Sequence, residues 1–505
     1  MDLVQGMMTG FAVATTWSNL FLVFIGAVLG TLVGILPGLG ATSTIAILIP
    51  VALGMNPASA MIMLVGMCCG ARYGGAVTAI LMNLPGESSA VVTCLDGYQL
   101  ALQGRAGPAL GLAAISSFVG GTVSIFGLMF LSPLLSRVAV GFGPPEYFTL
   151  TLMGLCLVTS LTGKSVIKGM LSAAIGLILA TVGSDIFTGA LRLTLGRLEL
   201  MDGISFVTIA VGLFAVGEIL INVEQGVKFT LMEVPKKLSQ LLPSGRDIVQ
   251  CLGTWARSTI IGFIIGVLPG TGATVASFLS YTVAKNVSKT PERFGRGAVE
   301  GVAASESADN ASTSGALVPM FTLGIPGSSA AAMLMVVLLM FGVRPGPMLL
   351  VDHPHIFWGV VASMYIGNIM LLIMNLPMIP ILVQFLRVPY YLLYIIILVV
   401  GSIGVYSIDS SVFDLWLMGI SGVIGYIFKK LDYPPVALLL ALILGPMVER
   451  ALRQSLIMSN EGFSIFLTRP VAAVFLVLAI VALFAPWLQQ MWLRRVRRKQ
   501  LPSTR

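Results

Sequence analysis

Apolar residues fill most of this 505-residue chain, in runs long enough to cross a lipid bilayer. A crossing helix needs roughly 20 mostly apolar residues. Two further stretches, near 30–100 and 262–345, are apolar but crowded with Gly, Pro, Ser and Thr, which break helices and let backbones approach closely. The pattern predicts an all-α polytopic membrane protein with broken helices and re-entrant hairpins, in roughly 10 to 13 membrane segments. The clear spans are 17–36, 110–135, 147–161, 165–182, 204–222, 253–268, 356–386, 390–407, 411–428 and 471–493.

Composition and charge agree with a membrane protein, because 57% of the residues are hydrophobic and only 10% are charged. A soluble domain carries about 25% charged residues. The net charge of +8 predicts no nucleic-acid site, since the basic residues form no single patch with interleaved aromatic residues. Basic residues after an apolar run mark a cytoplasmic end, and here they predict a cytoplasmic C-terminus. They are Arg494, Arg495, Arg497, Arg498 and Lys499, with Lys429 and Lys430 two crossings earlier.

The residues that most often carry catalytic or metal chemistry form no recognisable set. The five cysteines have no C-x-x-C spacing and are predicted to be small core residues. His353 and His355 are too few for a metal site, and no Ser/His/Asp or Cys/His set is credible. The Gly-rich segments lack a Lys-Ser/Thr ending, so no nucleotide-binding loop is predicted. The N-terminus has no basic n-region, which predicts that the first apolar run stays as a helix. We expect no enzyme activity and no cofactor.

Internal repetition is the strongest signal in the chain. Gly34-Ile-Leu-Pro-Gly-Leu-Gly-Ala-Thr42 returns as Gly266-Val-Leu-Pro-Gly-Thr-Gly-Ala-Thr274, with seven of nine positions identical and an offset of 232. Leu84-Pro-Gly-Glu-Ser-Ser-Ala90 then matches Ile325-Pro-Gly-Ser-Ser-Ala330, where Pro85 and Pro326 are offset by 241. Matches in the same order predict a duplicated structure.

A third match, Pro145-Glu-Tyr147 with Pro389-Tyr-Tyr391, has an offset of 244. The slowly growing offset is what two copies with small insertions produce. We therefore expect two repeats, inverted if an odd number of crossings separates them. The predicted divisions are a first repeat at 1–223, a polar linker at 224–250, a second repeat at 251–470, and a C-terminal helix with a basic tail at 471–505.

The repeated Pro-Gly pairs, Pro37-Gly38 and Pro269-Gly270, interrupt apolar runs where a helix is expected to continue. Freed backbone groups are tolerated in a membrane only where protein or a water-filled cavity satisfies them. Paired breaks in two halves are typical of a transporter's central site. Thr42 and Thr274 are predicted to cap the half-helices that follow, whose N-termini suit carboxylates.

The second repeated motif predicts the tips of two helical hairpins, which offer hydroxyl and N–H groups to an oxyanion. The alternative is that all four Pro-Gly sites are tight turns between full crossings. The predicted substrate-binding residues are Pro37, Gly38, Gly40, Thr42, Asn83, Pro85, Gly86, Ser88, Ser89, Pro269, Gly270, Gly272, Thr274, Pro326, Gly327, Ser328, Ser329 and Arg72.

Charge distinguishes the two halves. The small-residue stretch from Ala298 to Gly315 contains Glu306, Asp309 and Asn310, which we predict as a coupling site for Na⁺ or H⁺, because acids at membrane depth are costly and usually functional. The first half offers Arg72 instead, which suits either a substrate carboxylate or one of these acids.

The doubled G-x-L-P-G-x-G-A-T segment and the two hairpin tips resemble the large membrane subunit of the tripartite tricarboxylate transporters, over about residues 15 to 490. The resemblance implies a small four-helix membrane subunit and a periplasmic solute-binding protein as partners. It implies uptake of tricarboxylates or related organic acids driven by an ion gradient. Analogy with other hairpin-bearing anion transporters suggests an elevator movement. Glu87, inserted in the first tip, departs from the second half.

Three alternatives remain at this stage. One is a stand-alone secondary anion transporter or channel, and another is an intramembrane enzyme acting on lipid-linked substrates with acids from Glu300 to Asp309. The third is a membrane scaffold, which leaves the paired breaks without a purpose. A homodimer is compatible with all of them.

Overall fold

The computed structural model describes residues 3–36, 40–161, 165–225, 240–270, 272–385, 390–459 and 462–484. Over these residues the chain is helical, apart from one two-stranded ribbon. The predicted residues Pro37 and Gly38, Pro389 of the third repeat match, most of the predicted linker and the basic tail lie outside the described residues.

Within the described ranges, eight helices are long and apolar enough to cross a membrane, or nine if one bent pair counts as a single span. Shorter apolar helices, such as Ala41–Leu53 after the first Pro-Gly break and Ser329–Met340 after the second hairpin tip, fall below the length of a crossing. The helix Pro435–Met458 is missing from the predicted spans, because Pro446 and the charged residues Glu449 and Arg453 interrupt its apolar pattern. The prediction of a helical polytopic membrane protein is confirmed, with fewer uninterrupted spans than expected.

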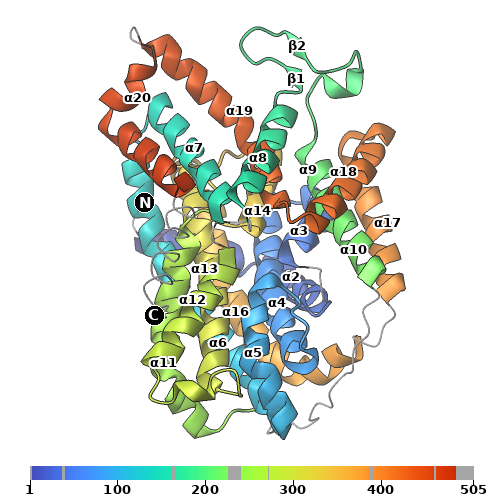
Figure 1. Ribbon diagram of the computed structural model, residues 1–505, viewed down its shortest axis with the longest axis vertical. Helices are drawn as coiled ribbons and strands as arrows, with labels where there is room; N and C mark the ends of the chain where they lie inside the picture. Colours follow the sequence, from blue (N-terminus) through green and yellow to red (C-terminus); the bar gives the residue numbers. More distant parts are fainter. Residues whose placement is uncertain are drawn as a thin grey trace, which may run out of the picture. The chain divides into compact units, whose positions relative to one another are not determined.

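The chain divides into two compact units, each made of two separate stretches. Unit 1 contains 1–140 and 207–426, and unit 2 contains 141–206 and 427–505. The helices of unit 1 are labelled in Figure 1. They are α1 Leu3–Ala14, α2 Trp17–Gly34, α3 Ala41–Leu53, α4 Pro57–Met82, α5 Val91–Leu100, α6 Ala106–Ala139, α10 Gly217–Gln225, α11 Gly245–Val267, α12 Gly272–Val287, α13 Val299–Leu323, α14 Ser329–Met340, α15 Leu349–Asp352, α16 Pro354–Phe385 and α17 Tyr390–Asp409, with α9 Phe206–Ala210 and α18 Val412–Lys430 at its boundaries.

Short 3₁₀ and π segments connect several of these helices in unit 1. The 3₁₀ turn η1, Ser88–Ala90, leads into α5, and the π segment η2, Ala101–Arg105, joins α5 to α6. A second π segment, η4 at Val211–Val216, joins α9 to α10, and the 3₁₀ turn η6, Pro291–Arg293, precedes α13. Such irregular turns are frequent at functional sites and helix ends.

Two helix pairs in unit 1 pack with their backbones nearly touching, α2 on α4 and α11 on α13 (Figure 1). A Cβ atom added to Gly30 would lie 2.1 Å from the carbonyl oxygen of Met67, and one added to Gly262 would lie 2.4 Å from that of Ala308. Only glycine permits this approach, which membrane helices use for close packing. The small residues of the two Gly-rich stretches therefore bring α4 and α13 deep into the unit.

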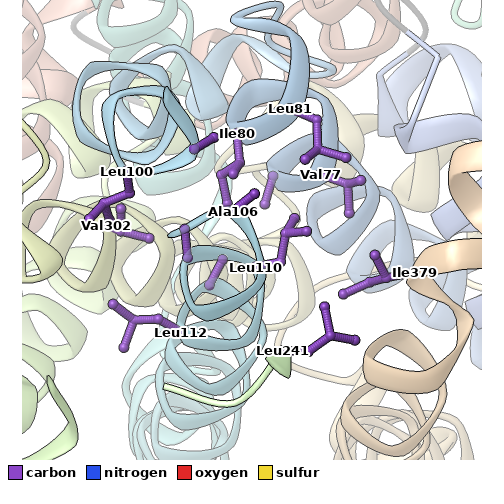
Figure 2. Close-up of a cluster of buried hydrophobic side chains, with 14 of the residues drawn as sticks. Val77, Ile80, Leu81, Leu100, Ala106, Leu110, Leu112, Leu241, Val302 and Ile379 are labelled. Atoms are coloured by element: carbon purple, nitrogen blue, oxygen red, sulfur yellow. The ribbon is translucent and has the colours of Figure 1, made fainter. Parts of the chain in front are cut away.

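A large apolar cluster surrounds these helices and includes residues from α4, α5, α6, α13 and α16. Figure 2 shows Val77, Leu110, Val302 and Ile379 within it. Along α4 and α13 nearly every side chain is buried. Helices buried all round belong to the centre of a bundle, so polar groups on α4 and α13 must find partners inside the protein.

Unit 2 is built from α7 Pro144–Leu161, α8 Val166–Ala180, α19 Pro435–Met458 and a C-terminal helix at 470–484. The short strands β1 Gly183–Ser184 and β2 Leu191–Arg192 pair antiparallel, followed by the 3₁₀ turn η3 Leu198–Leu200. The turn η7 Gly462–Ser464 and α20 Ile465–Thr468 meet the C-terminal helix at a bend of 93°. Within this unit Asp185 pairs with Arg192 and Arg453.

Candidate substrate and ion site

The start of α3 already binds a carboxylate. Gly40 is the N-cap residue, and the backbone N–H of Ala41 donates to Oε1 of Glu87 from the first hairpin tip. The first N–H groups of a helix have no partner within the helix and carry partial positive charge. The predicted capping role of Thr42 is therefore wrong, because a side chain from 46 residues later caps this helix.

The threonines after the two breaks instead bond across the unit to the opposite tips. Thr42 Oγ1 lies 2.8 Å from Ser329 Oγ, and Thr274 Oγ1 donates to Ser88 Oγ at 3.0 Å. Each break therefore meets the tip of the other half. Thr274 sits in the first turn of α12 and, like Thr42, makes a tertiary contact where a local cap was predicted.

The tips themselves turn through left-handed residues and close glycine contacts. Asn83 ends α4 at φ 55°, and Gly324 ends α13 at φ 70°. A Cβ atom on Gly86 would lie 2.1 Å from the carbonyl oxygen of Gly34, and one on Gly327 would lie 2.8 Å from that of Gly266. Each tip is thus held against the helix that precedes the break in its own half.

The remaining predicted residues of this region shape the backbone of the breaks and tips through hydrogen bonds, a helix cap and positive φ angles. Gly270 N–H donates to the carbonyl of Gly327, and Ser328 accepts from the N–H of Ala331 as the N-cap of α14. Gly270 and Gly272 both have positive φ. Pro85, Pro269 and Pro326 lie between the helices in these turns.

Arg72 of α4 pairs with Asp309 of α13, and both side chains are almost fully buried. Ser89 Oγ donates to the second oxygen of the same carboxylate at 3.0 Å. Of the two roles that the sequence left open for Arg72, the structure shows the pairing with an acid of the second half. A buried ion pair needs such additional hydrogen bonds to offset the desolvation of two charges.

Glu306, one helical turn before Asp309, has a different environment. Thr93 Oγ1 of α5 donates to Oε1, and Ser117 Oγ of α6 donates to Oε2 at 3.0 Å. The side chain is 1% exposed, and no ion pair reaches it within the described part of the chain. Asn310 is also buried, but its amide donates to the backbone oxygen of Glu306 rather than to a carboxylate.

Three residues of this site escaped the sequence analysis. Glu87 was noted only as a difference between the tips, while Thr93 and Ser117 carry no motif. A hydroxyl on an apolar helix usually bonds the backbone of its own helix, so the sequence gives no sign of a more distant partner. Only the packing of α5 and α6 against α13 shows that Thr93 and Ser117 bond Glu306.

Comparisons with known proteins place this arrangement in a family. The family model described as "Tripartite tricarboxylate transporter TctA family" matches residues 20–440. An uncharacterized 52.8 kDa protein in the TAR-I ttuC' 3'region of Agrobacterium vitis is 45% identical over 479 residues, which are 94% of this chain and 94% of the relative. An uncharacterized protein in the TAR-II ttuC' 3'region of the same organism is 44% identical over 220 residues, 44% of this chain and 91% of the relative.

No solved structure matches the chain. The family match spans more than half of the sequence, and its members are transport proteins that act with partner subunits rather than enzymes. The resemblance seen in the repeated motifs is thereby confirmed, and so is a multi-pass membrane protein. The chain belongs to the tripartite tricarboxylate transporter TctA family, whose members are large membrane subunits.

Proposed function

We propose that this chain is the permease subunit of a secondary transporter in a bacterial inner membrane, with a cytoplasmic C-terminus. It takes up tricarboxylates or related organic acids that a periplasmic solute-binding protein delivers, and it works beside a small four-helix membrane subunit. A gradient of Na⁺ or H⁺ drives the uptake. The observation that carries the proposal is the reciprocal pairing of Thr42 with Ser329 and of Thr274 with Ser88.

This pairing supports two repeats related by a pseudo-two-fold axis. The offset of 232 relates Thr42 to Thr274, and the offset of 241 relates Ser88 to Ser329. An inverted arrangement has its axis in the membrane plane, as in transporters whose halves alternate access. On this alignment Glu87 stands where the second half has Ser328, so the first tip contains a substitution rather than the expected insertion.

The proposed substrate site is the region where both half-helices begin. The N-terminus of α3 bonds the Glu87 carboxylate, which supports its suitability for a substrate carboxylate. At α12 the corresponding tip residue is Ser328, which brings no negative charge. We propose that a substrate carboxylate binds first near α12 and that a second one competes with Glu87 at α3.

For the ion, Glu306 is a better candidate than Asp309. The carboxylate of Asp309 is already matched by Arg72, whereas Glu306 is bonded by hydroxyl groups alone among the described residues. Acids at membrane depth mark ion pathways and proton relays in pumps and transporters. An elevator movement of the helices that carry the breaks remains a proposal by analogy.

Uptake of radiolabelled citrate and of C4-dicarboxylates into proteoliposomes tests the proposal. We expect uptake only when the small subunit and the loaded binding protein are present with this chain. Uptake by this chain alone would favour the stand-alone transporter or channel. Imposing a Na⁺ gradient and a pH gradient separately identifies the driving ion.

A matched pair of variants tests the site. Thr274→Val removes the hydroxyl that meets Ser88 and is expected to reduce uptake strongly. Thr282→Val lies two turns along the same helix, where its exposed hydroxyl bonds its own backbone, and is expected to transport normally. Equal uptake by both variants would contradict a substrate site at the paired tips.

A further inference from the structure

A small cavity lies between α4, α6 and α16 in unit 1. Its interior of about 10 Å³ is the space of one water molecule. Most of its wall is apolar, and Figure 2 shows three of these residues, Val77, Leu110 and Ile379. The polar residues that line it are Tyr73 of α4, Ser117 of α6 and Asn375 of α16.

Two of these polar groups have no hydrogen-bond partner. The hydroxyl of Tyr73 and Oδ1 of Asn375 are both buried and unpaired among the described residues, and each side chain is 3% exposed. The Asn375 amide nitrogen donates to the carbonyl of Leu371, which leaves Oδ1 as the side-chain atom without a partner. A buried polar atom without a partner costs free energy, and two beside one cavity indicate that a polar ligand belongs there.

We infer that this cavity is a binding site for one water molecule, which forms a proton relay to Glu306 and makes H⁺ the coupling ion. The inference rests on the proposed function, because it identifies the ion of the proposed transporter. A water here accepts from Tyr73, donates to Oδ1 of Asn375 and donates to Oγ of Ser117. Three hydrogen bonds are typical of buried water. The cavity wall offers three polar side chains and no charged group, which suits a water molecule rather than a cation.

Ser117 connects the cavity to the carboxyl group, because its hydroxyl lines the cavity and donates to Oε2 of Glu306. In the relay a proton arrives on the water as hydronium and passes to Oγ of Ser117. At the same time the original Ser117 proton passes to Oε2 of Glu306. One O–H bond breaks at each donor and one forms at each acceptor, so the water and the serine are restored and the carboxylate becomes a neutral acid.

The surroundings of Glu306 allow both protonation states. The charged and titratable groups near it are Asp309 on its own helix, Arg72 and Tyr73 on α4, and Cys94 on α5. Arg72 is held by Asp309, so it does not fix a charge on Glu306. Hydroxyl groups donate or accept by rotation, and the shell made by Thr93 and Ser117 therefore serves either form.

The test uses the complete transporter in proteoliposomes that contain a pH-sensitive dye. Ser117→Ala removes the relay hydroxyl, and Asn375→Leu fills the cavity with a side chain that binds no water. We expect each to slow substrate-dependent proton entry by at least about tenfold, since positioned proton-transfer groups contribute about 10²–10⁴-fold in enzymes. Ser124→Ala is the matched control, because it removes a buried hydroxyl of the same helix that bonds Ser314 away from the cavity.

Substrate counterflow at equal pH on both sides separates the two proposals. We expect the unmodified transporter and Ser124→Ala to show counterflow, because exchange needs no net proton movement. Proton entry in Ser117→Ala as fast as in Ser124→Ala, or uptake that requires Na⁺ and ignores the pH gradient, would overturn the relay. Absence of counterflow in the unmodified transporter would overturn the proposed function itself.

Discussion

Asp309 and Glu306 lie one turn apart on α13, but their carboxyl groups have different bonding partners. Asp309 meets Arg72 and the hydroxyl of Ser89, so its negative charge is matched by a fixed positive charge. Glu306 meets only the hydroxyls of Thr93 and Ser117 within the described residues. The first arrangement requires an ionised acid, and the second accepts a neutral or an ionised one. The contrast separates a structural ion pair from the group that we propose to exchange a proton.

The largest expected effect comes from Asp309→Asn. This change leaves the buried guanidinium of Arg72 without its anion, and breaking a buried ion pair from one side costs about 3–5 kcal/mol. The free energy of unfolding, measured by SDS titration of the purified protein in micelles, should fall by that amount. The double variant Arg72→Met with Asp309→Leu should be more stable than Asp309→Asn, because no charge is left unpaired. If the double variant is less stable than Asp309→Asn, the unpaired charge of Arg72 is not the cause of the loss in free energy of unfolding.

Ser89→Ala should have the next largest effect. It removes the hydrogen bond to the second oxygen of Asp309, and hydrogen bonds to charged groups contribute about 1.5–3 kcal/mol. The same SDS titration measures the loss. A combination with Asp309→Asn tests the assignment, since the two losses should then be clearly less than additive.

Ser117→Ala should destabilise the protein less than Ser89→Ala. The carboxyl group of Glu306 keeps Thr93 as a partner, and an ordinary hydrogen bond contributes about 0.5–1.5 kcal/mol. Comparison of the two variants under the same conditions measures the difference directly. A loss in Ser117→Ala that equals or exceeds the loss in Ser89→Ala would show that Glu306 needs charge stabilisation as much as Asp309 does.

Glu306→Gln should have the smallest effect on stability, below about 1 kcal/mol, because hydroxyls can rotate to accept from the new amide. It should nevertheless abolish uptake driven by a pH gradient, since glutamine carries no exchangeable acid proton. Folding and uptake are measured on the same preparation. Retained proton-driven uptake would remove Glu306 from the proposed coupling site, and unfolding comparable to Asp309→Asn would remove the contrast between the two acids.

The sequence predicted much of this arrangement at the level of segments. Apolar runs predicted the membrane helices, since their length is set by the bilayer. The repeated motifs predicted the family, and they pointed to the tips that meet the two breaks. The helix Pro435–Met458 was missed, because its charged residues pair within unit 2 and so are compatible with an otherwise apolar helix.

The local role of Thr42 was predicted wrongly for a related reason. A threonine beside a helix start usually caps it, but the first N–H of α3 bonds Glu87 and leaves Thr42 for Ser329. Competition between partners distant in the sequence decided the outcome. The residues next to Thr42 in the sequence do not reveal these distant partners.

What the sequence by itself determined is the class of molecule, the family, the positions of the helix breaks and the presence of two acids on a small-residue helix. Which acid is paired with Arg72, which is surrounded by hydroxyls, and which of those hydroxyls lines a small cavity was decided only by tertiary structure. The physical reason is that Arg72, Ser89, Thr93 and Ser117 lie about 190 to 240 residues from their partners on α13. Burial makes each polar group require a partner, and only the packing of the helices determines which partner is within reach.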